Sequence, residues 1–321
     1  MKNFAITGLA GYIAPRHLQA IKETGNLLVA AMDTHDSVGV LDKYFPNASF
    51  FTEYERFDRH LEKLKRSDAG NKIDYLSVCS PNHLHDAHIR LALRVGADAI
   101  CEKPLVLNPW NLDALSLLEK EYEKKIYSVL QLRLHNSLIN LKDTILNQSK
   151  KEKYDVELTY ITSRGMWYDY SWKGNIEKSG GIATNIGIHF FDLLIWLFGG
   201  VKNYEVQLSE KRRMGGFIEL ENANIRWYLS INFEDLPDAV KTQSKSTFRS
   251  IKVDSKEIEF TEGFTDLHTR TYDKILHHQG FGIEDARDSI ELVHKIRNAK
   301  LSYKSDKEMI HYNTKRYLGV I

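Results

Sequence analysis

The first 130 residues alternate short apolar runs with segments whose apolar residues recur at helical spacing. Such alternation predicts a parallel sheet covered by helices on both faces, because parallel strands must be joined by crossover connections. The expected strands are Phe4–Thr7, Leu28–Asp33, Tyr75–Ser80, Asp98–Glu102 and Lys125–Leu130, and the expected helices are Pro15–Glu23, Phe57–Lys65 and Leu84–Val95. The N-terminal part is therefore predicted to be a doubly wound α/β domain.

The pattern changes after residue 130. A helix is expected near Ser137–Leu146, a strongly apolar helix at Thr184–Phe198 and a charged helix at Ile283–Ala299. Most of the remaining segments resemble antiparallel strands with one solvated face; they are Tyr154–Ser163, Tyr204–Lys211, Gly216–Leu220, Ile225–Asn232, Thr247–Val253 and Lys256–Phe260. A chain of 321 residues exceeds what one hydrophobic core usually supports, so we expect two domains. The first, residues 1–130, is expected to bind a cofactor. Residues 131–321 are expected to form an α+β domain with a large, mainly antiparallel sheet that binds substrate and forms oligomer contacts.

Composition excludes several classes of function. The formal net charge is only +1, and no basic run is interleaved with aromatics, which argues against nucleic acid as the main partner. The N-terminus lacks the apolar run of a signal peptide, and the stretch from Ile186 to Phe198 is too short to span a membrane. Two cysteines, Cys79 and Cys101, are too few for a zinc site or a disulfide framework. We expect a cytoplasmic protein that binds no membrane.

A glycine-containing turn follows the first strand and opens the first helix. Gly8, Gly11, Tyr12 and Ile13 lie there, with the spacing Gly-x-x-Gly-x-x-Ala in place of the more usual Gly-x-Gly-x-x-Gly. Glycines at such a turn let the backbone approach a pyrophosphate, which a helix N-terminus stabilises. The alternative interpretation is that these glycines serve only to form the turn and bind no ligand.

Asp33 supports the cofactor interpretation. It ends the second strand, where a carboxylate accepts hydrogen bonds from the hydroxyls of an adenosine ribose. The same carboxylate repels a 2′-phosphate, and the following Thr34 and His35 supply no permanent cation. The three-part pattern of a Rossmann domain therefore predicts NAD in preference to NADP.

Two further segments lie at the carboxyl ends of predicted strands, where a doubly wound sheet binds its ligands. Ser80, Asn82 and His85 follow the third of the strands given above, and Glu102 and Lys103 follow the fourth. A positively charged nicotinamide nearby would lower the pKa of the Lys103 amine and help it accept a proton. We expect no metal at His83, His85 and His88, because their spacing lacks a carboxylate or thiolate set.

Three sequence motifs together resemble the Gfo/Idh/MocA oxidoreductase family over the whole chain. They are Glu102-Lys103-Pro104, the segment from Ser80 to His85, and the segment from Gly180 to Asp192. The resemblance implies that Lys103 and His189 are the catalytic residues. Asn185 stands where many members have aspartate, and its position four residues before His189 puts both on one helix face. An amide cannot relay charge to His189, which shifts the weight of base catalysis to Lys103.

Within this family, the chain resembles the WlbA branch. The similarity lies in the segments from Gly11 to His17, from Gln131 to His135 and from Met166 to Gly174. That branch implies NAD-dependent oxidation of carbon 3 of UDP-N-acetyl-glucosaminuronate to a ketone, ahead of an aminotransferase that builds a diacetamido uronic acid for surface polysaccharide such as lipopolysaccharide O-antigen. It also implies a homo-tetramer and reoxidation of NADH by a 2-oxo acid such as 2-oxoglutarate.

The strip from Arg164 to Gly174 combines cations with aromatic rings. Arginine and lysine suit diphosphate and carboxylate groups, and aromatic rings stack on flat ligands. The alternative interpretation is that the aromatic residues pack against the sheet and do not contact a ligand. The residues predicted to bind substrate are Arg133, Arg164, Trp167, Tyr168, Ser171, Trp172, Lys173, Asn185 and His189.

The predicted reaction transfers the hydrogen of carbon 3 as hydride to the nicotinamide while the hydroxyl loses its proton. Lys103 and His189 would both hydrogen-bond that oxygen, one taking the proton and the other stabilising the negative charge. Two alternatives stay open: a dehydrogenase of a free sugar or polyol such as an inositol, and a non-catalytic sensor of NAD or sugar.

Overall fold

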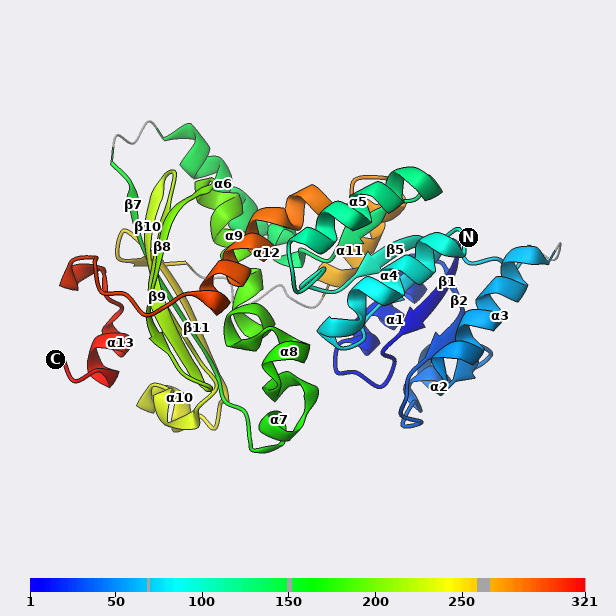
Figure 1. The fold of residues 1–321 in the computed structure, drawn as a ribbon, viewed down its shortest axis with the longest axis horizontal. Helices are drawn as coiled ribbons and strands as arrows, with labels where there is room; N and C mark the ends of the chain where they lie inside the picture. Colours follow the sequence, from blue (N-terminus) through cyan, green and yellow to red (C-terminus); the bar gives the residue numbers. More distant parts are fainter. Residues whose placement is uncertain (68–69, 149–151, 259–265, 321) are drawn as a thin grey trace. The chain divides into compact units, whose positions relative to one another are not determined.

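The computed structural model describes residues 1–67, 70–148, 152–258 and 266–320. These residues form two compact units (Figure 1). Unit 1 contains Met1–Leu134 and Gly263–Arg287, and unit 2 contains His135–Glu262 and Asp288–Ile321. This grouping differs from the division expected at residue 130, because a C-terminal segment joins unit 1.

Unit 1 is built on a six-stranded parallel sheet of order β3-β2-β1-β4-β5-β6. Its strands are β1 Asn3–Thr7, β2 Leu27–Met32, β3 Ser49–Phe51, β4 Tyr75–Val78, β5 Asp98–Cys101 and β6 Ile126–Ser128. Its helices are α1 Ala14–Glu23, α2 Val40–Tyr44, α3 Tyr54–Arg66, α4 His85–Arg94, α5 Trp110–Tyr122 and α11 Leu267–Leu276. The predicted doubly wound α/β domain is confirmed, and β3, α2, α5 and α11 are elements that the pattern analysis did not identify.

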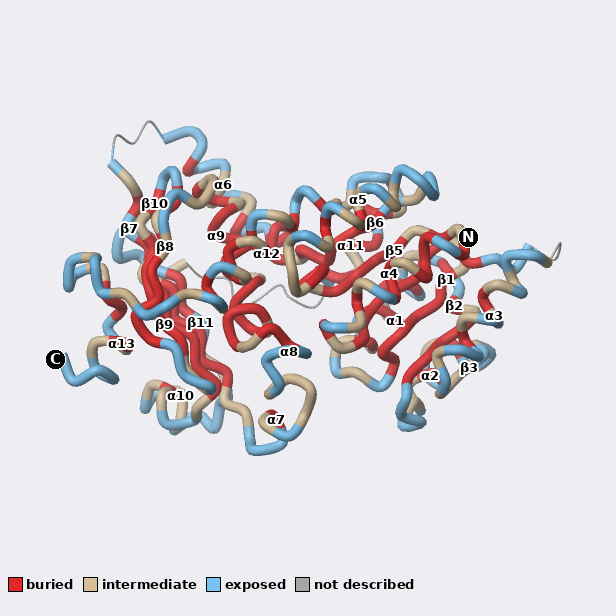
Figure 2. Tube along the Cα trace, in the orientation of Figure 1, coloured by how far each residue is buried: buried red, intermediate tan, exposed pale blue. Residues whose placement is uncertain are grey.

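The core of unit 1 explains why α11 belongs to it. Strand β4 is buried at every residue, and β1 is buried at every residue after Asn3, as the red trace of β1 shows (Figure 2). Tyr272 and Ile275 of α11 are fully buried in one cluster with Phe4 of β1 and with Ala14 and Leu18 of α1. Apolar residues three apart on α11 and four apart on α1 supply the packing face.

Unit 2 holds a six-stranded sheet of order β12-β11-β7-β10-β9-β8. All its strand pairs are antiparallel except β7 with β10, so the predicted mainly antiparallel sheet is confirmed. The strands are β7 Tyr154–Thr162, β8 Val201–Ser209, β9 Arg213–Leu220, β10 Ala223–Ser230, β11 Thr247–Val253 and β12 Lys256–Glu257. The last two residues of the strand expected at Lys256–Phe260 lie outside the described residues.

The helices of unit 2 are mostly short. They are α6 Asn136–Asn147, α7 Trp167–Tyr170, α8 Ile176–Ser179, α9 Ile188–Phe198, α10 Asp238–Lys241 and α13 Tyr312–Tyr317, while α12 Ile283–Asn298 crosses the division between the units. The α-helix expected at Thr184–Phe198 is wrong in its first turn, because Ala183–Gly187 forms a π-helix before α9 begins. Single π-helical turns of this kind occur frequently at functional sites.

Helix α9 packs on the sheet through small and aromatic residues. A Cβ on Gly187 would lie 2.6 Å from Cδ1 of Leu229, and the rings of Phe191 and Trp227 meet edge to face at 5.3 Å. The segment Ile176–Phe198 is long and apolar enough, by composition alone, to span a membrane, but 78% of its most apolar window is buried within the protein. Burial of this extent is what a core helix shows.

Candidate active site

The glycine turn of unit 1 has a backbone that only glycine can adopt. Gly8 has φ +80°, and a Cβ there would lie 2.4 Å from backbone atoms of Cys79 and Ser80. Its N–H donates to the Met32 carbonyl at 2.9 Å, and the Gly11 N–H donates to the Gly8 carbonyl at 3.1 Å. The turn therefore closes tightly against β2 and β4 directly before α1, which is the arrangement that presents backbone to a pyrophosphate.

The Asp33 carboxylate is fixed beside this turn. One oxygen accepts a hydrogen bond from the Ala10 N–H at 2.8 Å and the other from the His35 N–H at 2.9 Å. Each carboxylate oxygen has a second lone pair, so the group keeps the capacity to accept from ribose hydroxyls. The turn, the helix N-terminus and this carboxylate thus fit the adenosine and pyrophosphate parts of a dinucleotide.

His85 joins the two segments that follow β4 and β5. Its Nδ1 lies 2.7 Å from the Pro104 carbonyl and its Nε2 lies 2.8 Å from the Ser80 carbonyl. Burial lowers the pKa of the ring, against the raising effect of both carbonyls. His85 is only 1% exposed and links these segments through its two carbonyl partners, and its place at the nicotinamide end of the cleft stays a prediction. Asn82 is also buried, and the Ser80 hydroxyl lies 2.8 Å from Nδ1 of His88.

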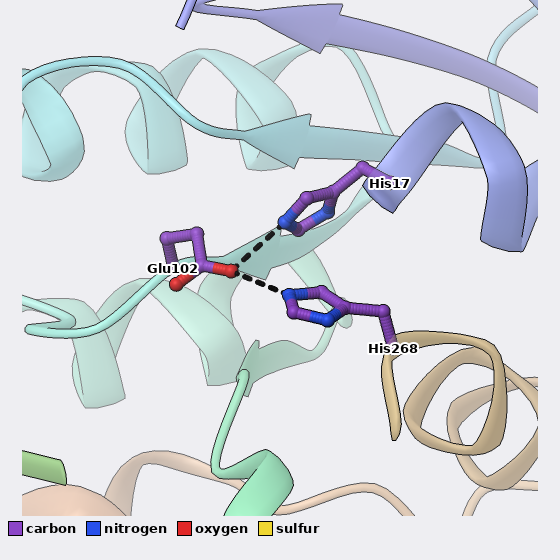
Figure 3. A group of neighbouring side chains, drawn as sticks. All are labelled: His17, Glu102 and His268. Atoms are coloured by element: carbon purple, nitrogen blue, oxygen red, sulfur yellow. Dashed lines mark hydrogen bonds and ion pairs between the residues drawn. The ribbon is translucent and has the colours of Figure 1, made fainter. Parts of the chain in front are cut away.

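Lys103 stands at the carboxyl end of β5 and is partly exposed. Burial lowers the pKa of its amine, and the nearby Glu102 carboxylate raises it. Glu102 is buried and points toward two histidines from distant parts of the chain, His17 of α1 and His268 of α11 (Figure 3). Pattern analysis assigned no role to these histidines, and nothing in the sequence around His268 indicates one.

In unit 2, Asn185 and His189 reach the surface of an otherwise buried segment. From Ile182 to Ile195 they are the only residues that are not buried, and every residue of that segment is described. The Asn185 side-chain amide donates to the Tyr168 hydroxyl at 2.8 Å, while the ring of His189 packs against Tyr160 and Phe190. The predicted proximity of Asn185 and His189 on one face agrees with this exposure pattern.

A cavity of about 290 Å³ lies in unit 2 beside Tyr168. Lys173, Lys211 and Arg297 line it, together with Asp169, Glu210 and a set of glycine and apolar side chains. Asp169 is paired with Lys211 at 3.2 Å and with Arg212, and Glu210 accepts from the Tyr317 hydroxyl at 2.6 Å. The lining thus holds three basic side chains against two acidic ones, and this excess of positive charge suits an anionic ligand.

The structure brings together part of the predicted substrate strip. The Lys173 ammonium lies 5.4 Å from the ring centre of Trp167 and 5.7 Å from that of Trp172. Ser171 has a structural role, since its hydroxyl donates to the Tyr168 carbonyl and accepts from the Lys173 N–H. Arg164 contributes its carbonyl, which accepts from Arg212. None of these contacts tests substrate binding, so the binding roles of all six residues of the strip stay predictions: Arg164, Trp167, Tyr168, Ser171, Trp172 and Lys173.

Arg133 belongs to unit 1, whereas the strip belongs to unit 2. Its guanidinium donates to the Asp285 carbonyl at 2.7 Å, pairs with the Asp285 carboxylate at 3.4 Å and stacks over Phe281. The side chain is buried and anchors the first turn of α12. The expectation that Arg133 binds substrate therefore has no support from its contacts, which account for the residue structurally.

Family models match both units. An oxidoreductase-family model described as an NAD-binding Rossmann fold matches residues 2–130, and the companion model, described as a C-terminal alpha/beta domain, matches residues 152–236. Both carry the family name Gfo/Idh/MocA. Together the two models cover more than half of the chain.

Solved structures resemble the chain over nearly its full length. The WlbA (WbpB) dehydrogenase from Thermus thermophilus, in complex with NAD and alpha-ketoglutarate, is 51% identical with a TM-score of 0.92, covering 97% of this chain and 99% of that one. The same enzyme in complex with NAD and UDP-GlcNAcA is 50% identical, with a TM-score of 0.92 and coverage of 98% and 100%. The WlbA dehydrogenase from Bordetella pertussis, 19% identical with a TM-score of 0.74 and coverage of 95% and 99%, shares the fold.

Curated relatives match more weakly. D-glucoside 3-dehydrogenase from Escherichia coli is 28% identical over 134 residues, which is 40% of this chain and 36% of that protein. Glucose-6-phosphate 3-dehydrogenase from Bacillus subtilis is 27% identical over 212 residues, covering 62% of this chain and 54% of that protein. The chain thus aligns with only about a third to a half of these two relatives. With the family models over both units and the full-length structural matches, the chain belongs to the Gfo/Idh/MocA family of NAD-binding oxidoreductases.

Proposed function

We propose that this enzyme oxidises carbon 3 of UDP-N-acetyl-glucosaminuronate to a ketone with NAD as the hydride acceptor. The observation that carries the proposal is the 50% identity, over essentially the whole chain, to a Thermus thermophilus dehydrogenase in complex with NAD and UDP-GlcNAcA. Two curated relatives named as 3-dehydrogenases of other sugars support the choice of carbon 3. Coupling the purified protein to an aminotransferase of the same pathway type should yield a 3-amino sugar nucleotide, and a product aminated at another carbon would refute the regiochemistry.

The residues of this chain supply binding and proton transfer. When bound at the glycine turn and Asp33, NAD would supply the hydride acceptor. Lys103 takes the proton that the sugar hydroxyl loses, since burial lowers the pKa of its amine toward the working range of a base. His189 is the proposed second catalytic group, a half-buried residue in the first turn of α9.

Asp33 is expected to set the preference for NAD over NADP. In Asp33→Asn, the amide loses the charge that strengthens hydrogen bonds from ribose hydroxyls, so NAD binding should weaken about tenfold or more. The repulsion of a 2′-phosphate disappears as well, so the ratio of NAD to NADP affinity should fall further. Cofactor titrations by fluorescence measure both, and Asp36→Asn, at an exposed position nearby, is the matched control. An unchanged ratio of NAD to NADP affinity would show that the Asp33 carboxylate only accepts hydrogen bonds from the Ala10 and His35 N–H groups and does not contact the ribose.

The cavity beside Tyr168 is our candidate for the uridine diphosphate part of the substrate. Lys173 and Arg297 line it, and burial lowers the pKa of the Arg297 guanidinium. Arg297→Gln should weaken UDP binding about tenfold at low salt, and the loss should shrink as salt rises. Calorimetry with UDP tests this against Lys295→Gln, an exposed cation of the same helix. Equal affinities in both variants would place the diphosphate elsewhere.

Dehydrogenation of a free sugar or polyol is the competing function. Inositol dehydrogenases are among the relatives, at 28% identity or less over 40–41% of the chain. Tight binding of UDP alone separates the two functions, since an enzyme for free sugars needs no diphosphate pocket. A non-catalytic sensor would bind NAD without turning over any sugar.

The wider setting of the reaction is also a proposal. Reoxidation of NADH by 2-oxoglutarate is supported by the Thermus thermophilus complex with NAD and alpha-ketoglutarate. A role in building a diacetamido uronic acid for O-antigen, a cytoplasmic location, a homo-tetramer, and the absence of membrane and nucleic-acid partners follow from the resemblance and the composition. Light scattering of the purified protein measures the oligomeric state.

A further inference from the structure

A buried hydrogen-bond chain in unit 1 connects four elements that are distant in sequence. The Ser77 hydroxyl lies 2.6 Å from the Tyr272 hydroxyl, which lies 2.7 Å from Nδ1 of His17. Nε2 of His17 then lies 2.9 Å from Oε1 of Glu102, and Nε2 of His268 lies 3.1 Å from the same oxygen (Figure 3). All five side chains are buried.

One assignment of hydrogens satisfies this chain. Ser77 donates to Tyr272, Tyr272 donates to Nδ1 of His17, and both histidines donate from Nε2 to a Glu102 carboxylate. Burial lowers the pKa of the His17 ring, which agrees with a neutral imidazole. Burial alone would raise the pKa of the Glu102 carboxyl, but the hydrogen bonds from His17 and His268 hold it well below its usual range. The chain therefore contains one buried anion, Glu102.

Lys103 adjoins that anion in the chain and in space. Oε2 of Glu102 accepts from the Lys103 backbone N–H at 3.3 Å. Both histidines donate to this carboxylate, and Lys103 is the neighbouring cation whose pKa the carboxylate raises, while His85 is occupied by two carbonyls. The titratable groups around Glu102 are His17 of α1, Cys79 after β4, His85 of α4, Cys101 of β5, and His268 and Tyr272 of α11.

We propose that His17 and His268 are positioning residues that hold Glu102 as the anionic counter-ion of Lys103, and so set the pH range in which Lys103 accepts the substrate proton. The inference rests on the proposed function in one respect, namely that Lys103 is the base that accepts the proton of the sugar hydroxyl. α11, whose His268 and Tyr272 lie one turn apart and face the network, thereby becomes part of the catalytic apparatus without touching the substrate.

The sign of the expected effect follows from charge. Lys103 acts as a base only when neutral, so activity falls as the pH drops below its pKa. Removing the neighbouring anion lowers that pKa, by about one unit or more for opposite charges at close range. In Glu102→Gln the acidic limb of the pH–rate profile should therefore move to lower pH by about one unit.

The histidine variants separate positioning from simple packing. His268→Leu removes one of the two donors that oppose the effect of burial, so the pKa of Glu102 rises, part of it becomes neutral, and the acidic limb should shift in the same direction. His268→Gln keeps an N–H donor and should restore most of the wild-type profile. His277→Leu, an exposed histidine just after α11, is the control for loss of an imidazole. Melting temperatures show whether each variant is folded.

A second readout does not need the substrate. Competitive labelling of lysines with an amine reagent over a pH series, resolved by peptide mass spectrometry, gives the pKa of Lys103 directly. A lowered pKa in Glu102→Gln and His268→Leu supports the inference, even if UDP-N-acetyl-glucosaminuronate proves not to be the substrate. An unchanged pKa in folded variants overturns it, even if turnover falls.

The same three ligand-type side chains also have the composition of a metal site. A metal ion would have to replace the hydrogens that both histidines donate to Glu102. The inference therefore predicts no stoichiometric metal in the purified protein by elemental analysis, and one equivalent of a transition metal lost in His268→Leu would overturn it.

Discussion

Lys103→Met is expected to lower kcat by about 10²–10⁴-fold while leaving NAD binding intact. Methionine has nearly the length of lysine and fits the partly buried position, but it cannot accept a proton. The loss should appear in kcat and kcat/KM together, because proton transfer contributes only in the transition state. Steady-state kinetics with UDP-N-acetyl-glucosaminuronate, beside a fluorescence titration of NAD, measures both quantities.

Lys120→Met provides the control for this variant. Lys120 is an exposed residue of α5, and its substitution should leave both quantities unchanged. Full turnover in Lys103→Met with normal NAD binding would remove Lys103 from the mechanism and leave His189 as the base.

Gly8→Ala is expected to disrupt the cofactor site and the fold around it. A positive φ costs an alanine about 1 kcal/mol. In addition, its Cβ would lie 2.4 Å from the backbone of Cys79 and Ser80, which cannot move aside as a flexible side chain can. We expect a stability loss of about 3 kcal/mol and NAD binding weakened by at least about a hundredfold.

Gly25→Ala separates the two contributions. Gly25 has φ +73°, but a Cβ there meets no atom within 4 Å. It should therefore show only the backbone cost of about 1 kcal/mol and unchanged NAD binding. Denaturant unfolding with and without NAD measures both variants. If they lose equal stability and bind NAD equally, the close approach of the turn to β4 has no part in forming the cofactor site.

Runs of apolar residues in the sequence predicted most strands of unit 1 and the site residues at their ends. The predicted strands of unit 1 are short and mostly apolar, so their positions follow from the sequence. The positions of Asp33 and Lys103 follow as well, because both residues stand where such strands end. The edge strand β3 is three residues long and has no comparable pattern.

The network around Glu102 could not be predicted in this way. His17 and His268 are 251 positions apart, and they meet only because α11 returns to pack on α1. The π-helical turn before His189 likewise depends on packing, since Gly187 lets α9 approach Leu229. Arg133 shows the converse, because a basic side chain suited to a ligand is used to anchor α12.

The most direct test of the proposed function is the reduced-nicotinamide absorbance after mixing the protein, NAD and UDP-N-acetyl-glucosaminuronate. We predict that absorbance rises and falls again when 2-oxoglutarate is added. No rise with this sugar nucleotide, in protein that binds NAD, together with a rise with a free sugar or polyol, would contradict the proposal.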